Sequence, residues 1–172
     1  MGENKKDNFV KEIKYMIPMI AIALVIVAFD QWTKAMIRAK LATIGVSEVI
    51  KGFFEFSYSE NTGAAFGSFQ GKNAIFIIVG IIAIGFIFYI FKSLNRSTWM
   101  RISFGLILGG ALGNLIDRIA FGFVIDFIRI RVTPSIWWPN FNIADAGITV
   151  GAIMFAVYKL IDSYRISDYS ND

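Results

Sequence analysis

The sequence predicts a membrane all-α protein: a four-transmembrane-helix bundle with a small extracytoplasmic β-sheet cradle. Of its 172 residues, 56% are hydrophobic and 17% are charged, and the mean hydropathy is +0.59. That composition is too apolar for a soluble domain. Four apolar stretches are suited to crossing a hydrocarbon layer about 30 Å thick. We expect all 172 residues to form one integral-membrane domain.

The composition also limits the chemistry. Histidine and cysteine are both absent, which excludes thiol nucleophiles, disulfides, histidine bases and the commonest zinc ligands. Asp, Glu, Ser, Thr, Lys, Arg and Tyr remain as reactive side chains. We expect no metal and no cofactor. The net charge of +4 is small, and nothing in its placement supports binding to nucleic acid.

The first apolar stretch predicts a transmembrane helix over residues 17–39. Four lysines precede it, as in a cleavable signal peptide, but a cleavage site needs small residues. The run ends instead in Phe29, Asp30, Gln31 and Trp32, so we expect an uncleaved helix. Asp30 and Lys34 are four residues apart and therefore face the same way. The spacing fits a solvated ion pair at the helix end as well as a part of a functional site.

Residues 45–67 are expected to form the sheet. Glu48 to Ser59 alternate partly between polar and apolar side chains, as strands with one covered face do. The segment ends in a run of small residues, Asn61 to Gly67. Asn61 and Gly63 fit a tight turn, and small residues also let an extended substrate backbone approach closely. Spacing alone does not decide between these two interpretations.

Three further helices are expected over residues 74–91, 102–119 and 143–161. In the second of these, Gly105, Gly109 and Gly113 recur every four residues and predict a ridge on which another helix packs closely. Asn114 and Arg118 lie four residues apart beside this ridge and form a polar face at the helix end. The positive-inside rule favours cytoplasmic termini, because the short loop after residue 91 and the N-terminal segment are rich in basic residues. The sheet would then be extracytoplasmic.

Two aspartates stand out in this arrangement. Asp126 precedes the last helix and Asp145 lies in its first turn, so both are expected near the outer end of the bundle. Two carboxylates in one site share a proton and titrate as a pair, so that one accepts a proton from water while the other donates to a carbonyl oxygen. The alternative is an ordinary loop residue at 126 and an acidic first turn at 145, beside an Asn142 cap.

At these residues the sequence resembles the bacterial lipoprotein signal peptidase family, also called signal peptidase II. The resemblance rests on four blocks in order: Asp30 to Lys34 (DQWTK), Asn61 to Gly67 (NTGAAFG), Gly109 to Arg118 (GGALGNLIDR), and a pair of aspartate motifs. The pair is Val124 to Phe127 (VIDF) and Trp138 to Asp145 (WPNFNIAD).

The resemblance implies an aspartic endopeptidase of the bacterial cytoplasmic (inner) membrane. Its substrate would be a diacylglyceryl-modified prolipoprotein, cut just before the lipidated cysteine by water that Asp126 and Asp145 activate. It further implies no metal or cofactor, no partner besides substrate and membrane lipids, and a monomer. Residues with implied roles around the substrate and the dyad are Asp30, Lys34, Asn61, Gly63, Asn114, Arg118, Asn142 and Ala144. Asp117 is expected to be a structural neighbour.

Three other functions fit parts of the sequence. A small transporter or proton channel also uses carboxylates at membrane depth, but the second and fourth helices lack ionisable residues in their centres. A serine peptidase would use Lys34 as a base for Ser59 or Ser68, and neither serine is specially placed. A membrane scaffold would leave the aspartates replaceable.

Overall fold

The computed structural model describes residues 3–63, 71–93 and 97–169. Four helices and four strands make up these ranges. In chain order they are α1 (Glu3–Leu41), β1 (Val46–Ile50), β2 (Phe54–Asn61), α2 (Asn73–Ser93), α3 (Thr98–Phe121), β3 (Val124–Thr133), β4 (Ile136–Trp137) and α4 (Ile143–Tyr169).

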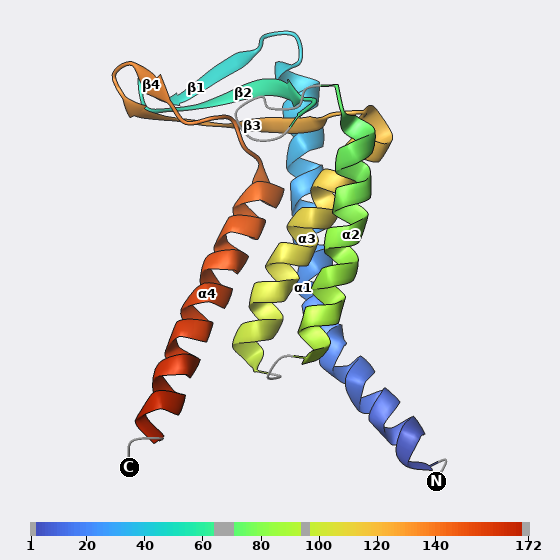
Figure 1. Cartoon of the computed structure of the whole chain (residues 1–172). Coiled ribbons are helices and arrows are strands. Elements are labelled where there is room, and N and C mark those ends of the chain that lie inside the picture. Colours follow the sequence, from blue (N-terminus) through green and yellow to red (C-terminus); the bar gives the residue numbers. More distant parts are fainter. Residues whose placement is uncertain (1–2, 64–70, 94–96, 170–172) are drawn as a thin grey trace.

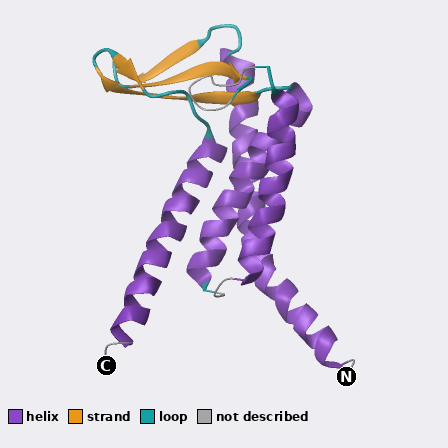
Figure 2. Ribbon diagram, in the orientation of Figure 1, coloured by secondary structure: helices purple, strands orange, loops and turns teal. Residues whose placement is uncertain are grey.

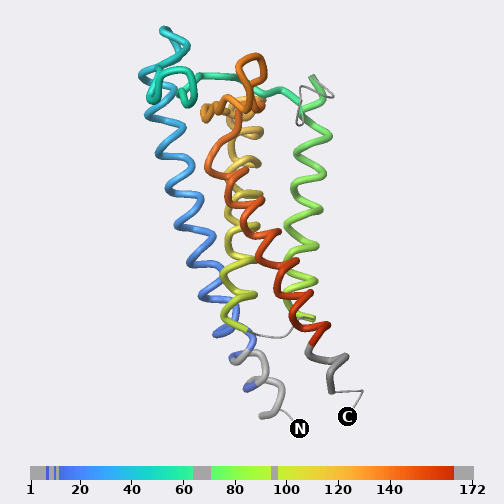
Figure 3. The backbone as a smooth tube through the Cα atoms, turned by 90° about the vertical axis from the view of Figure 1, so that its left-hand side faces the viewer, coloured from blue at the N-terminus to red at the C-terminus, as the bar shows by residue number. Residues whose placement is uncertain are grey.

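The four helices form a bundle that carries the sheet across one end (Figure 1). Helix α3 is central, because it contacts α1, α2 and α4. The N-terminal turns of α1 and the C-terminal turns of α4 both lie at the end far from the sheet (Figures 1 and 3), and Figure 1 shows them splayed apart there. All four helices have the length and composition of membrane spans, which confirms the predicted four-helix layout. Each is longer than the sequence pattern indicated.

The exposed surface of the helices is apolar. Helix α2 has 21 residues, or about 31 Å at a rise of about 1.5 Å per residue, which matches the hydrocarbon layer of a bilayer. Its exposed side chains include Ile78, Ile82 and Phe86. Large apolar side chains facing outward along a whole helix are typical of lipid contact, because water would disfavour them.

Glycines set the distances between α3 and its neighbours. A Cβ added at Gly109 would lie 2.7 Å from Ile26 Cβ of α1, and one at Gly105 would lie 2.8 Å from Ile22 Cβ. On the side facing α4, a Cβ at Gly110 would collide with the carbonyl oxygen of Ala144. The predicted packing ridge is therefore confirmed, and it extends to a second face of α3.

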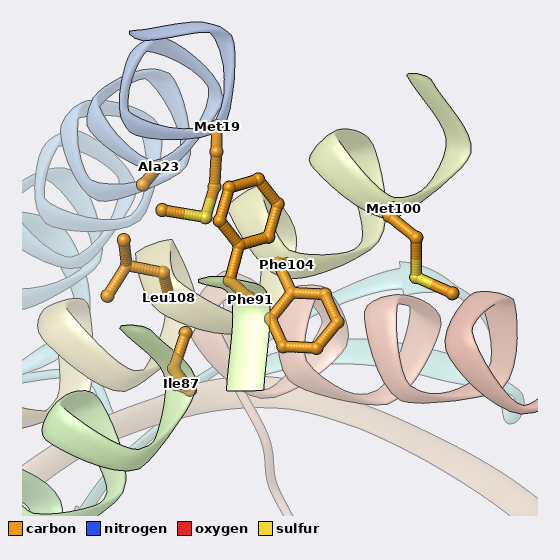
Figure 4. Packing of buried hydrophobic residues seen from close by; sticks show 7 residues of the cluster. All are labelled: Met19, Ala23, Ile87, Phe91, Met100, Phe104 and Leu108. Atoms are coloured by element: carbon orange, nitrogen blue, oxygen red, sulfur yellow. The ribbon is translucent and has the colours of Figure 1, made fainter. Parts of the chain in front are cut away.

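The apolar core lies in the half of the bundle away from the sheet. Rings connect three helices there: Phe104 of α3 is 5.7 Å from Phe91 of α2 and 5.4 Å from Phe155 of α4, between ring centroids. Figure 4 shows the cluster. Its buried members are Met19, Ala23, Ile87, Phe91, Met100, Phe104 and Leu108. The polar residues discussed below lie in the other half, next to the sheet.

The sheet is antiparallel, with strand order β1-β2-β3-β4, and lies over the helix ends (Figure 2). The sequence prediction was incomplete here. We expected a sheet over residues 45–67 with Asp126 in a loop, but residues 124–137 supply two of its four strands. Asp126 lies in β3, opposite Ser59 of β2. Part of the expected sheet segment, residues 64–67, lies outside the described residues.

Candidate active site

Helix α4 begins with a capping box that fixes Asp145. Asn142 precedes the helix, and its Oδ1 accepts a hydrogen bond of 2.9 Å from the backbone N–H of Asp145. In return the backbone N–H of Asn142 donates to Asp145 Oδ2 at 3.2 Å. This reciprocal pair satisfies two amide groups that the helix itself leaves free. The capping role predicted for Asn142 is thus present, and it places the carboxylate of Asp145 at the helix N-terminus.

Strand pairing places Asp126 beside that cap. The segment after β4 returns along β3, where Phe141 exchanges backbone hydrogen bonds of 2.8 and 3.1 Å with Ile128. The antiparallel register continues with Asn142 opposite Phe127, the residue after Asp126, and the Nδ2 of Asn142 donates to Asp126 Oδ1 at 2.7 Å. From the other side, Asn61 at the end of β2 donates to Asp126 Oδ2 at 2.9 Å. Asp126 is held between two elements that are distant in sequence.

Three asparagines surround the two carboxylates. Asn114 of α3 donates to Asp145 Oδ1 at 2.7 Å, and Asn142 donates to Asn114 Oδ1 at 3.1 Å. With the contacts above, each of the four carboxylate oxygens accepts a hydrogen bond from an amide N–H. We name Asp126 and Asp145 the aspartate pair. Its members come from β3 and α4 and are joined through Asn142.

Burial and a neighbouring charge change the acidity of the pair. Removal from water, the larger effect, and the negative charge of Asp145 together raise the pKa of Asp126 to about 7. The hydrogen bonds from Asn61 and Asn142 and the charge of Lys34 act the other way. Near neutral pH, Asp126 is therefore able both to keep a proton and to release it, as a general acid or base must.

The pair faces a cavity of about 1090 Å³ between the sheet and the start of α4. Six of the predicted site residues line it: Asn61, Gly63, Asn114, Arg118, Asp126 and Asp145. The cavity continues along the first turns of α4 to Ile148, Thr149 and Val150. Val150 is five residues beyond Asp145, which is about 7.5 Å along a helix, so the cavity extends from the sheet into the apolar depth of the bundle.

Arg118 of α3 connects the cavity wall to the turn after β2 and to α2. Its guanidinium donates to the carbonyl oxygen of Gly63 at 3.2 Å and lies 5.1 Å from the ring centroid of Phe76 in α2. The Gly63 N–H in turn donates to Asn61 Oδ1 at 3.0 Å, which is the predicted tight turn. The rest of the small-residue run, residues 64–67, lies outside the described residues.

Asp30 and Lys34 lie behind the aspartate pair. They form a buried ion pair, so the prediction of a solvated ion pair at the helix end is wrong. Lys34 Nζ is 2.8 Å from Asp30 Oδ2 and 2.8 Å from Asp117 Oδ2, and the exposed fractions of the three side chains are 2%, 0% and 0%. Lys34 also donates to Asn114 Oδ1 at 3.2 Å. We name Asp30, Lys34 and Asp117 the lysine cluster. Its ammonium contacts two carboxylates and an amide and, among the described residues, no serine; Ser68 lies outside them.

Ala144, for which the resemblance implied a role around the substrate and the dyad, does not line the cavity. Ala144 is fully buried and packs against α3. A Cβ added at Gly113 would lie 3.2 Å from the Cβ of Ala144. Its backbone N–H donates to Asp30 Oδ1 at 2.9 Å. The small side chain permits close packing of α4 on α3.

Two further residues of this region had no predicted site role. Asp117, expected to be a structural neighbour, is buried and accepts hydrogen bonds from Gln31 and from the backbone of Ile125. Gln31 donates to Asp117 Oδ1 at 2.8 Å and to Asp30 Oδ2 at 3.2 Å. One signal was available, because Asp117 is three residues after Asn114 and so shares its helix face.

Comparisons with known proteins agree on one family. Residues 22–161 match the sequence profile of the family described as signal peptidase (SPase) II. A lipoprotein signal peptidase of Clostridium novyi (strain NT) is 44% identical over 135 residues, which cover 78% of this chain and 91% of that protein. One from Symbiobacterium thermophilum is 41% identical over 143 residues, covering 83% and 93%.

A solved structure agrees as well. A bacterial membrane enzyme determined by the in meso method at 2.3 Å resolution superposes with a TM-score of 0.76. It is 39% identical in sequence, and the match covers 84% of this chain and 88% of that one.

Proposed function

Because the chain belongs to the signal peptidase II family, we propose that it removes the signal peptide from diacylglyceryl-modified prolipoproteins. The cut falls just before the lipidated cysteine, and the aspartate pair is the catalytic dyad. The observation that carries this proposal is the pair itself: two carboxylates joined through Asn142 at the wall of a large cavity.

The chemistry follows from the shared proton. With one proton on the pair, the charged carboxylate accepts a proton from water, and the resulting hydroxide attacks the scissile carbonyl carbon. The protonated carboxyl donates its proton to the carbonyl oxygen. When the tetrahedral intermediate collapses, the C–N bond breaks, the carboxyl that took the proton of water gives it to the leaving nitrogen, and the other carboxylate regains a proton from the hydroxyl group. The raised pKa of Asp126, about 7, supports this division of roles near neutral pH. The amides of Asn61, Asn114 and Asn142 keep both carboxylates oriented and add no competing charge.

The cavity suits a substrate with a peptide part and a lipid part. Next to the sheet it is lined by polar groups such as Ser59 and Asn140, which offer partners to an extended backbone. Along α4 it is lined by Ile148 and Val150, and Val150 is 49% exposed. An acyl chain placed there would remain in an apolar surrounding while the peptide reaches the pair.

The protein is a multi-pass protein of the bacterial inner membrane, and we propose that its termini are cytoplasmic and its site extracytoplasmic. The basic loop and N-terminal segment support this orientation. Single cysteines introduced into the cysteine-free chain test it. A cysteine at Ser47 in β1 should react with an impermeant reagent from the outer side. Labelling from the cytoplasmic side alone would contradict the orientation.

Replacement of the pair tests the mechanism. Asp126→Asn and Asp145→Asn should each abolish cleavage of a lipidated prolipoprotein in detergent, because neither variant can share a proton in the required way. The variants keep the shape of the side chain, and thermal unfolding checks that they fold. A matched control is Asp162→Asn, near the far end of α4, which should cleave at the wild-type rate. Full turnover by either folded dyad variant would end the assignment.

A further inference from the structure

The two members of the aspartate pair come from different elements, so their separation depends on contacts between those elements. Asp126 lies at the start of β3 and Asp145 in the first turn of α4. Asn142 is fully buried and joins the two carboxylates by donating its side-chain amide to Asp126 and its backbone N–H to Asp145. A second connection joins them from behind, through backbone groups.

That second connection uses the residue that precedes each aspartate. The N–H of Ile125 donates to Asp117 Oδ2 at 3.0 Å, and the N–H of Ala144 donates to Asp30 Oδ1 at 2.9 Å. Ala144 is in the first helical turn, where the helix offers no acceptor for its N–H, so Asp30 supplies one. Consecutive Cα atoms are a fixed distance of about 3.8 Å apart, so a shift of either amide displaces the neighbouring aspartate.

Lys34 joins the two acceptors. Its ammonium group lies 2.8 Å from Asp30 Oδ2 and 2.8 Å from Asp117 Oδ2. Gln31 makes a parallel link, donating to Asp117 Oδ1 at 2.8 Å and to Asp30 Oδ2 at 3.2 Å. Both carboxylates are therefore fixed to each other and to α1. They are fully buried, where such contacts are strong because water does not compete.

We propose that the lysine cluster sets the separation of the aspartate pair by holding the backbone of Ile125 and Ala144 at a fixed distance. Asp30 and Asp117 are positioning residues, and Lys34 determines how far apart they lie. The proposal rests on the proposed function in one respect, that the aspartate pair is the catalytic dyad.

Amide hydrogen exchange tests the geometry without reference to activity. Asp117→Glu keeps the charge and moves the carboxylate by one methylene, so exchange at the Ile125 amide should accelerate about tenfold, the effect of losing one ordinary hydrogen bond, with a smaller change at Ala144. Asp30→Glu should produce the reverse pattern. Unchanged exchange at both amides in both variants would overturn the proposal.

The pH dependence of kcat/KM tests the consequence for the pair. Asp126 is faced by Asp145 of α4, Lys34 of α1 and Arg118 of α3, and the Glu variants leave all these charges in place. A wider separation weakens the repulsion from Asp145, so the basic limb of the profile should move to lower pH. We expect kcat to fall at least tenfold, with KM changed less than twofold. The proposal that Asp30 and Asp117 position the pair would be contradicted by two results together. These are a loss of activity that matches the fraction of unfolded protein and an unchanged basic limb of the pH profile.

Two further variants complete the test, one as a control for stability and one as a substitute if the Glu variants do not fold. Ser103→Ala removes a buried hydrogen bond of 2.6 Å to Gly151 between α3 and α4, so it should lower the Tm and leave both amides and the basic limb unchanged. If the Glu variants do not fold, Gln31→Met removes the parallel link without changing charge and should give the same shifts, smaller in size. Turnover by Asp126→Asn would refute the dyad alone, because hydrogen exchange would still decide whether the lysine cluster holds Ile125 and Ala144.

Discussion

Two pairs of carboxylates lie within the same end of this bundle, and they differ in what surrounds them. Asp126 and Asp145 accept hydrogen bonds from neutral amides, and both line the cavity. Asp30 and Asp117 share the ammonium group of Lys34 and are fully buried.

The difference explains why one pair suits chemistry and the other suits structure. A cation between two carboxylates stabilises both charges, and no proton has to be exchanged. Asp126 instead accepts hydrogen bonds from neutral amides, and burial together with the charge of Asp145 raises its pKa to about 7. The two pairs have the same side chains, and they differ because only one pair holds a lysine between its carboxylates.

Replacement of Lys34 should have the largest effect, because it removes the feature by which the two pairs of carboxylates differ. Lys34→Met leaves Asp30 and Asp117 buried without their cation, and such a change typically costs about 3–5 kcal/mol. We expect a large fall in Tm in detergent. Thermal unfolding monitored by intrinsic fluorescence measures it. Lys40→Met, at an exposed position near the end of the same helix, is the matched control and should leave the Tm nearly unchanged. A Lys34→Met variant as stable as that control would show that Lys34 does not neutralise the cluster.

A methyl group between α3 and α4 should disturb both pairs by a smaller amount. Gly110→Ala places a Cβ against the carbonyl oxygen of Ala144, and overpacking of this kind costs about 1–3 kcal/mol. Ala144 is bonded to Asp30 and precedes Asp145, so kcat should fall together with stability.

The control for this substitution lies in α2. A Cβ at Gly85 would meet nothing within 4 Å, so Gly85→Ala should be neutral, or stabilising by up to about 1 kcal/mol from helix propensity. Equal Tm values for Gly110→Ala and Gly85→Ala would contradict this prediction, because they would show that α4 accommodates the added methyl group with no loss of stability.

The smallest expected effect concerns the side-chain amides around the aspartate pair. Asn61→Ala removes a hydrogen bond that favours the charged form of Asp126, so the pKa of Asp126 should rise further. The basic limb of the pH profile of kcat/KM should then move to higher pH. Asn140→Ala is the control, since Asn140 lines the same cavity but bonds to Ser57. A shift to lower pH, or an equal shift in both variants, would contradict this role of Asn61.

The helices and the position of Asp145 at a helix start were predictable because their signals are local. Long apolar runs identified the spans, and the Asn142 cap three residues before Asp145 marked the start of α4. The strand that carries Asp126 was missed, although Ile128, Ile130 and Val132 alternate with arginines in a period typical of a strand. Its partner is β2, more than sixty residues earlier, and a local pattern does not reveal such pairing.

The lysine cluster was only half predictable for the same reason. The spacing of Asp30 and Lys34 showed that they share a helix face. Asp117 reaches Lys34 only because glycines bring α3 close to α1. Whether the ion pair is solvated or buried depends on that packing, and the sequence of α1 alone does not contain it.

The contacts of Asn142 limit which substitutions can be accepted at this position during evolution. One planar amide accepts from the backbone of Asp145 and donates to Asp126 and Asn114. Aspartate would keep the acceptor and lose the donor, serine has too short a reach, and glutamine adds a methylene in a fully buried space. No single substitution is a small step, so we expect variation among functional descendants to fall elsewhere, on the lipid-facing surfaces of the helices.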